Sequence, residues 1–197
     1  MAVIHRTTVT PSKLDLLTTW LPSRPWYRGS APRLRKAGGF RIDDPAGAVG
    51  IEFLLVVDES DGVLYQVPLT YRGAPLAEAV LVGTAEHGVL GRRWIYDATS
   101  DPVAIGAVAD LLTGRTVAQA QNDSDTVDST VVVTGVGAAL LAGELGVAVD
   151  DSAHTAVALG STVVRFHRVP VVTRLDCVGS IVAPADSGSV VELVTVG

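Results

Sequence analysis

Two apolar runs of strand length, joined by a short polar turn, restrict the fold of this chain more than any other feature of its sequence. Residues 51–57 read IEFLLVV and residues 63–71 read VLYQVPLTY, and an Asp-Gly pair typical of hairpin turns lies between them. The sequence therefore predicts an antiparallel β-hairpin. Pro68 has no N–H to donate to a neighbouring strand, so we expect its strand to lie at a sheet edge or to bulge there.

A helix is predicted before this hairpin. Thr10 and Pro11 have the residue types of a helix cap and of a first helical position, and apolar residues then recur at helical spacing up to Trp20 and Leu21. Pro22 is expected to end the helix. The following residues 23–39 are rich in Pro, Gly and basic side chains, which predicts an irregular path over the surface.

A second helix is predicted after the hairpin. A short strand is expected at 94–98, and Asp101-Pro102 then has the residue types of a helix start. We expect this helix to run to residue 112 and to end at Gly114, because glycine readily adopts the left-handed conformation that closes helices.

The second half of the chain is rich in short β-branched runs separated by Gly, Asp and Ser clusters, which predicts a second antiparallel sheet or partial barrel. The fold class is therefore α+β, with one subdomain over residues 1–115 and a β-rich subdomain over 116–197. The strands expected in the second subdomain are 130–134, 156–159, 162–169, 180–182 and 190–196.

Composition indicates a cytoplasmic protein with no membrane partner. No uninterrupted apolar run reaches the ~18 residues that a membrane span requires, and the N-terminus lacks the pattern of a secretory signal. Cys177 is the single cysteine, so it forms no internal disulfide and supports no cysteine-based metal site. We interpret it as a small core residue.

The charge is distributed unevenly along the chain. Residues 1–41 hold eight basic groups and one acid, a balance of +7, whereas the whole chain carries −6, so the remainder carries −13. Such asymmetry is compatible with a nucleic-acid surface. We favour the alternative, in which the basic segment packs against the acidic remainder or contacts an acidic protein partner, and we expect no nucleic-acid partner.

The stretch from Trp20 to Gly29 reads WLPSRPWYRG. It resembles the W-L-P-x-x-x-W-[FY]-x-G signature of the N-terminal cap of actinobacterial maltokinases, which phosphorylate maltose in alpha-glucan and trehalose metabolism. The resemblance continues through residues 65–69 and 87–98 and covers about the first 115 residues. It implies a cystatin-like cap, an antiparallel sheet wrapped by the N-terminal helix.

The kinase machinery that follows such a cap is not recognisable in this sequence. Related kinases carry an H-G-D-x-x-x-x-N loop, and none of the four histidines here precedes Gly-Asp. The only lysines are Lys13 and Lys36, neither in a strand resembling a kinase ATP-binding strand. We therefore expect no catalytic residues, no metal site and no cofactor, and we interpret the Gly135-Val136-Gly137 stretch as a turn rather than a nucleotide loop.

Two groups of residues are candidates for ligand or partner binding. Trp26 and Tyr27 could stack on a sugar if they are exposed, but such aromatics more often fill a core. Their basic neighbours Arg24 and Arg28 could then contact a partner. The second group is His87, Arg92 and Arg93, which we expect on or beside a polar loop with Asp97 and Asp101, whose structural roles would be turn and helix cap.

The leading functional hypothesis is a non-catalytic, maltokinase-cap-like binding or regulatory module. It would dock on a sugar kinase or another glucan-metabolising enzyme, with the basic segment 24–41 facing an acidic surface. The alternative is a domain that binds a sugar or sugar phosphate through Trp26, Tyr27, Arg24 and His87. Homodimerisation through an apolar edge strand at 190–196 is left open.

Overall fold

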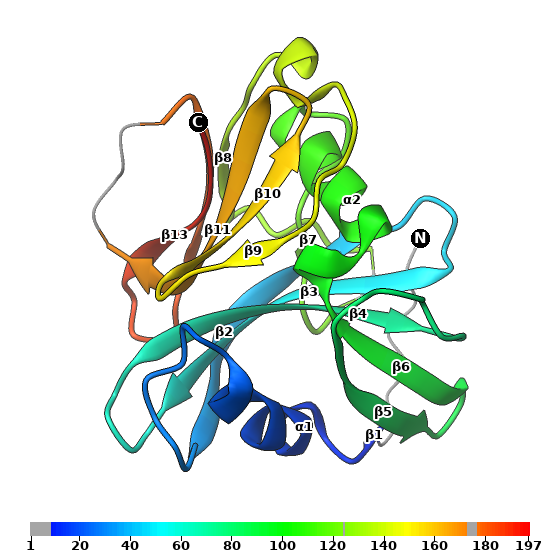
Figure 1. Ribbon diagram of the computed structural model, residues 1–197, viewed down its shortest axis with the longest axis vertical. Coiled ribbons are helices and arrows are strands. Elements are labelled where there is room, and N and C mark those ends of the chain that lie inside the picture. The colour runs from blue at the N-terminus through cyan, green and yellow to red at the C-terminus, as the bar shows by residue number, and fades with distance from the viewer. Residues whose placement is uncertain (1–8, 124, 173–176) are drawn as a thin grey trace.

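Two antiparallel sheets, the helices α1 and α2 and three short 3₁₀ helices form the regular structure of the described residues (Figure 1). The structure is a computed structural model and describes residues 9–123, 125–172 and 177–197. The first sheet, sheet A, has seven strands in the spatial order β1 (Val9–Thr10), β5 (Leu81–His87), β6 (Gly91–Asp97), β4 (Leu64–Arg72), β3 (Val49–Asp58), β2 (Leu34–Asp43) and β7 (Gln119–Ala120).

The second sheet, sheet B, is built from residues 132–196, which confirms the strand-rich second half. All five strands predicted there are present, with shifts of up to two residues at their ends. The six strands follow the order β8 (Val132–Thr134), β12 (Gly179–Pro184), β13 (Val190–Val196), β11 (Thr162–Val171), β10 (His154–Leu159) and β9 (Val149–Asp150). The structure therefore confirms a mostly antiparallel β-protein with an N-terminal helix and a second β-sheet in its C-terminal half.

Helix α1 (Lys13–Trp20) is capped by Ser12, not by Thr10 as expected. The Ser12 side chain accepts the backbone N–H of Asp15, and the Asp15 carboxylate accepts the backbone N–H of Ser12 at 3.0 Å. This reciprocal pair satisfies two donors at the helix start, which a lone Thr10 cap could not do. Thr10 instead pairs with Glu86 as part of β1.

Strand β2 corrects the expectation of an irregular path over residues 23–39, because regular structure begins again at Leu34. Gly38 and Gly39 lower the strand propensity of this segment, yet both lie within β2. Their φ angles are positive, 124° and 129°, at a register shift between β2 and β3. A side chain at Gly39 would lie 2.1 Å from the Phe53 carbonyl oxygen. Here glycine permits close strand pairing rather than a loop.

The predicted hairpin is confirmed as β3 and β4, which pair in uninterrupted register from Val49 opposite Arg72 to Val57 opposite Leu64. The expectation for Pro68 is wrong in its general form, because β4 lies inside the sheet between β3 and β6 and shows no bulge against β3. However, β6 pairs with β4 only from Leu69 onward. Pro68 therefore has no strand partner on that side.

Strand β3 is buried on both faces and separates two hydrophobic clusters. Ile51, Phe53 and Leu55 face helix α2 and sheet B, whereas Leu54 and Val56 face α1. This arrangement explains why residues 51–57 read as a continuous apolar run rather than as an alternation. The α1 cluster is completed by Leu17, Trp20, Leu21, Trp26, Tyr27, Tyr65, Val67, Leu69, Ala85 and Ile95.

Helix α2 (Pro102–Leu112) confirms the second helix prediction. Asp101 caps it by accepting the backbone N–H of Val103, and Gly114 follows its end with φ +72°. Asp101 also binds Arg72 of β4 through two hydrogen bonds of 2.6 and 2.7 Å, which fixes the helix start against sheet A. Among the described residues no helix is long and apolar enough to cross a membrane.

Buried polar side chains join the two sheets. Arg168 of β11 is fully buried and donates to Asp97, at the end of β6, at 2.5 Å, and to Thr155 of β10 at 2.6 Å. With its amide nitrogen facing sheet B, Gln66 of β4 donates to the carbonyls of His167 and Leu193 at 2.9 and 2.8 Å. Hydrogen bonds as well as apolar packing therefore determine how the sheets meet.

Two expectations for the C-terminal half are wrong. Strand β13 lies between β12 and β11, so it is not an edge strand and offers no edge for a dimer. Its apolar composition reflects burial within the sheet. Cys177 is half-buried and lies outside both hydrophobic clusters, because it precedes β12 at the surface of sheet B rather than inside it.

Replacing Arg168 by Met should destabilise the protein strongly, because the Asp97 carboxylate would stay buried without its cation. We expect the free energy of unfolding in urea to fall by about 3–5 kcal/mol. The control is Arg92→Ala, which breaks the exposed Arg92–Glu86 pair and should cost less than about 1 kcal/mol. Equal losses in the two variants would contradict a central role for Arg168.

Candidate functional site

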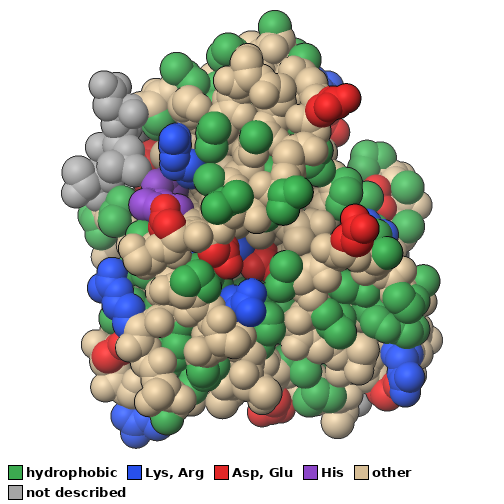
Figure 2. All heavy atoms as spheres, in the orientation of Figure 1, with side chains coloured by type: hydrophobic (Ala, Val, Ile, Leu, Met, Phe, Trp, Pro, Cys, Tyr) green, Lys and Arg blue, Asp and Glu red, His purple; other side chains and the backbone are tan. Residues whose placement is uncertain are grey.

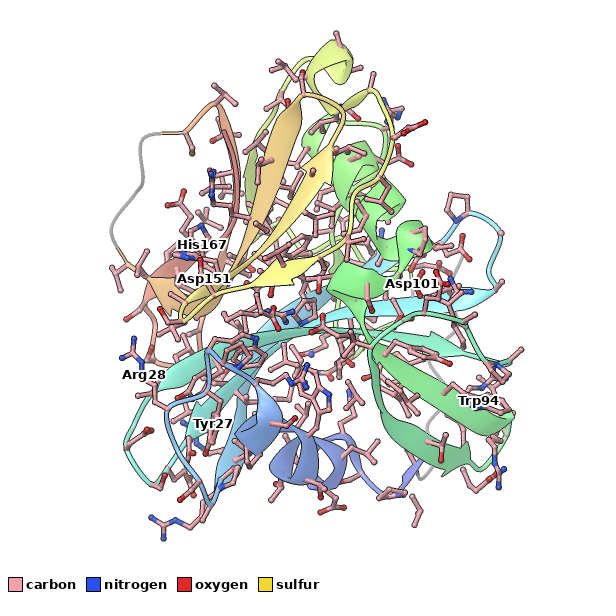
Figure 3. All side chains as sticks on the ribbon, in the orientation of Figure 1. Tyr27, Arg28, Trp94, Asp101, Asp151 and His167 are labelled. Atoms are coloured by element: carbon pink, nitrogen blue, oxygen red, sulfur yellow. The ribbon has the colours of Figure 1, made fainter. Side chains whose placement is uncertain are left out.

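The two groups of candidate residues lie at different ends of sheet A. Figure 3 places Tyr27 and Arg28 beside α1 at one side of the molecule, and Trp94, next to Arg92 and Arg93 in β6, at the opposite side. A single site that combines Trp26, Tyr27, Arg24 and His87 is therefore not formed.

Trp26 and Tyr27 are core residues, which confirms the interpretation favoured from the sequence and excludes the alternative of an exposed sugar platform. Trp26 is fully buried, and the Arg168 guanidinium lies 4.9 Å from the centre of its ring. Tyr27 is 8% exposed and donates its hydroxyl to Asp58 at 2.5 Å. The aromatic faces are enclosed by protein because Trp26 packs against the rings of Trp20 and Tyr65, and Tyr27 packs against Tyr65.

Arg24 and Arg28 remain at the surface of the same region. The Arg24 guanidinium lies 4.8 Å from the centre of the Trp20 ring, a cation–π contact that covers the tryptophan. Arg28 is exposed, while its backbone N–H donates to the hydroxyl of Tyr65 at 3.2 Å. The Arg28 side chain is available to a partner, whereas Arg24 is half-buried and donates Nε and Nη2 to the Ser23 hydroxyl at 3.2 and 3.1 Å.

His87 ends strand β5 and does not lie on a loop, because residues 84–87 pair with β6. Its Nδ1 accepts the backbone N–H groups of Val89 and Leu90 at 3.3 and 3.1 Å, so the ring proton belongs on Nε2. The side chain therefore supports the turn between β5 and β6. The neighbouring Arg92 forms an exposed ion pair with Glu86.

His87 and Arg93 line a cleft of about 460 Å³ on the α1 face of sheet A. Helix α1 is about 12 Å long, whereas a seven-stranded sheet is about 29 Å wide, so the helix covers only part of this face. Beyond it, the positions that alternate with core residues carry polar side chains. These are Arg41 in β2, Glu52 in β3, Tyr71 in β4, His87 in β5 and Arg93 in β6.

Glu52 is the buried centre of this cleft. Both of its carboxylate oxygens accept hydrogen bonds from the Lys13 ammonium group, at 2.7 and 2.9 Å. One oxygen also accepts from the Tyr71 hydroxyl at 2.6 Å, and the other from the Gln121 side-chain amide at 2.6 Å. Burial acts to raise the Glu52 pKa, but the Lys13 charge and these hydrogen bonds outweigh it, so the pKa is lowered. Burial and the Glu52 carboxylate together raise the pKa of Tyr71 well above its ordinary value.

Sequence reasoning missed most of the residues in this cleft. Lys13 and Gln121 are 108 positions apart in the chain, and only the fold brings both to Glu52. One signal was present in the sequence. Glu52 is the only acid within the apolar run 51–57, and a carboxylate in a buried strand requires partners.

The described residues contain no group of three or more His, Cys, Asp or Glu side chains arranged to hold a metal ion. In the cleft itself, Asp44 is bound by its own loop, where it accepts the backbone N–H groups of Ala46, Ala48 and Val49 at 2.9–3.0 Å. Both carboxylates that line the cleft therefore serve internal hydrogen bonds, and the remaining polar groups are mainly donors.

Fold and cleft together define a two-sheet domain with a polar cleft on the α1 face of sheet A. Within it, the family model for the maltokinase N-terminal cap domain matches residues 20–101. The match runs from the last residue of α1 to the Asp101 cap of α2 and includes strands β2 to β6. The resemblance drawn from the sequence is confirmed over this span, which associates it with maltokinase-type alpha-glucan metabolism. A search of curated proteins found no match.

Replacing Glu52 by Gln should destabilise the fold by about 2–4 kcal/mol, because Lys13 loses its buried counter-charge. The lowered pKa means that the ionised carboxylate contributes stability above its unfolded value of 4.5, and that this contribution is lost as pH falls below it. Urea unfolding from pH 7 to pH 3 should therefore show a shallower acid dependence in the variant. The exposed Glu86→Gln serves as control and should change stability by less than about 1 kcal/mol.

The Tyr27–Asp58 hydrogen bond generates a second pH prediction. Burial acts to raise the Asp58 pKa, but hydrogen bonds from Tyr27, Ser60 and the Arg33 backbone outweigh it and lower the pKa from 3.8 to about 2. This stability is present above pH 3.8 and is lost as pH falls through 2. Tyr27→Phe should lower the free energy of unfolding by about 1–3 kcal/mol at pH 7. The difference from wild type should shrink near pH 2, and a constant difference from pH 7 to pH 2 would argue against this assignment.

Proposed function

We propose that this protein is a non-catalytic binding or regulatory module that docks on a sugar kinase or another enzyme of maltose, trehalose or alpha-glucan metabolism in the cytoplasm. The observation that carries the proposal is the match of residues 20–101 to the maltokinase N-terminal cap domain. In this proposal the matched strands and α1 correspond to a cystatin-like lid. They would act on a neighbouring catalytic domain by contact rather than by chemistry of their own.

The fold limits where such a partner can dock. One face of sheet A is covered by α2 and sheet B, so the partner would approach from the side of α1 and the segment that follows it. Arg28 and Arg33 are exposed there, while Arg35 lies within 3.5–3.6 Å of Glu59 and Asp186. On the face shown in Figure 2, Lys and Arg side chains are spaced apart rather than joined in one patch. This pattern supports a protein partner whose acidic surface contacts a few separate basic side chains of this protein.

The second candidate function is direct binding of a sugar or sugar phosphate. Burial of Trp26 and Tyr27 removes the original basis for it, but the cleft around Glu52 supplies another, because it has the size of a small-molecule site and displays several hydrogen-bond donors. His87 and Arg93 belong to this candidate. Arg24 and Arg28 belong to the docking surface instead.

The docking proposal predicts a complex with the maltokinase of the source organism. Mixing the two purified proteins should give a dissociation constant of roughly micromolar order by titration calorimetry, and saturation with this protein should change the KM of the kinase for ATP. Arg28→Glu combined with Arg33→Glu should weaken the complex at least about tenfold and more at low salt, because like charges would then face each other.

The matched control is Arg92→Glu, which places the same charge change outside the proposed docking surface and should leave the affinity within about twofold. If the wild-type protein forms no complex with the maltokinase at about 100 μM, and none with the organism's other glucan enzymes, docking is ruled out. Equal weakening by the double variant and by Arg92→Glu would mean that the contact surface lies elsewhere.

A further inference from the structure

The cleft around Glu52 is lined by more basic side chains than acidic ones, so its own carboxylates do not neutralise all of its positive charge. Its lining includes the permanent cations Lys13, Arg41 and Arg93 and the carboxylates Glu52 and Asp44. Glu52 accepts four hydrogen bonds and Asp44 accepts three, all from the protein. A ligand that enters the cleft therefore meets few acceptors and several charged donors.

Two of these donors, Arg41 and Arg93, are held in place by hydrogen bonds to backbone carbonyls. Arg41 donates Nε to the Ala120 carbonyl and one Nη to the Asp123 carbonyl, at 3.0 and 3.2 Å. Arg93 donates Nη2 to the Leu90 carbonyl at 2.8 Å, and its Nε is buried without a hydrogen-bond partner among the described residues. Because this Nε has almost no accessible surface, a bound anion would contact the outer nitrogens of the Arg93 guanidinium, and the Nε–H would report on that contact.

Lys13 is the third cation and the most accessible one. Its ammonium group binds both oxygens of Glu52, yet its side chain is 39% exposed, whereas that of Glu52 is 6% exposed. Lys13 therefore spans the boundary between the buried carboxylate and the open cleft. His87 lies at the same cleft with its ring proton on Nε2 because Nδ1 accepts backbone N–H groups.

We propose that this cleft binds a small ligand by an oxyanion head group, phosphate or carboxylate, which Arg93 and Lys13 hold with support from Arg41. Arginine recognises such planar or tetrahedral oxyanions through charge-assisted hydrogen bonds. The rest of the ligand would lie against the apolar side chains of Val9 and Leu90 in the same cleft. This inference deepens the second candidate function and does not depend on the docking proposal.

Isotope-edited NMR of the full chain tests the site with inorganic phosphate and with acetate as separate probes, at constant ionic strength set by chloride. We expect saturable shifts, with a dissociation constant of roughly millimolar order, at the Arg93 Nε–H, the Gln121 side-chain amide and the Leu90 backbone amide. Whichever probe binds more tightly identifies the head group. Shifts that do not saturate, or that centre on Arg24 and Arg28, would overturn the proposal.

Arg93→Gln should weaken the binding of the better probe at least about tenfold, because it removes a charge-assisted donor. The control is Arg92→Gln, which alters the neighbouring arginine in the exposed ion pair with Glu86 and should leave the dissociation constant within about twofold. Equal effects of both variants would contradict a specific site. Maltose without an anionic group serves as a third probe, and saturable binding of maltose alone would reject the oxyanion proposal while preserving a sugar site.

Discussion

The buried ion pair between Arg168 and Asp97 is the interaction on which the arrangement of the two sheets depends. Both side chains are inaccessible to water, so each charge requires the other, and Thr99 and Thr155 supply further hydrogen bonds. Asp97 belongs to the segment that matches the maltokinase cap, whereas Arg168 lies 67 residues beyond its end. The cap-like strands and sheet B are therefore not independent layers that merely touch.

Glu52 repeats this principle elsewhere in sheet A. It lies inside the cap-like segment, but Lys13 and Gln121 lie before and after it. Two buried carboxylates of the matched segment are thus neutralised or satisfied by residues outside it. Because an unpaired buried carboxylate is costly, the residues that flank the segment are part of the same stable unit. Strand β7 lies beyond residue 115 and still pairs with β2 in sheet A, so both strand pairing and these buried contacts extend across a boundary near residue 115.

The parts of the fold that the sequence predicted are those determined by local chemistry. The β3–β4 hairpin follows from two apolar runs and an Asp-Gly turn, and α2 follows from Asp101, Pro102 and Gly114. The failures have non-local causes. Glycine at position 39 predicts a break in a strand, whereas in the fold it permits the close approach to Phe53, and the central position of β13 depends on which strands pair beside it. Register and strand order are set by packing between distant segments, which a single sequence does not display.

The same distinction between local and non-local causes explains why the sequence did not predict the cleft around Glu52. Trp26 and Tyr27 lie in the core, which is the placement that the sequence favoured over a sugar platform, because a β-domain with few aromatic residues needs them there. The polar cleft arose instead from positions that alternate with core residues on five different strands, beside the N-terminal end of the short helix α1. Each of these side chains, taken alone, looks like an ordinary strand residue. Only the pairing of the strands places their charges around one buried carboxylate, so a site of this kind follows from the topology and cannot be read from any one motif.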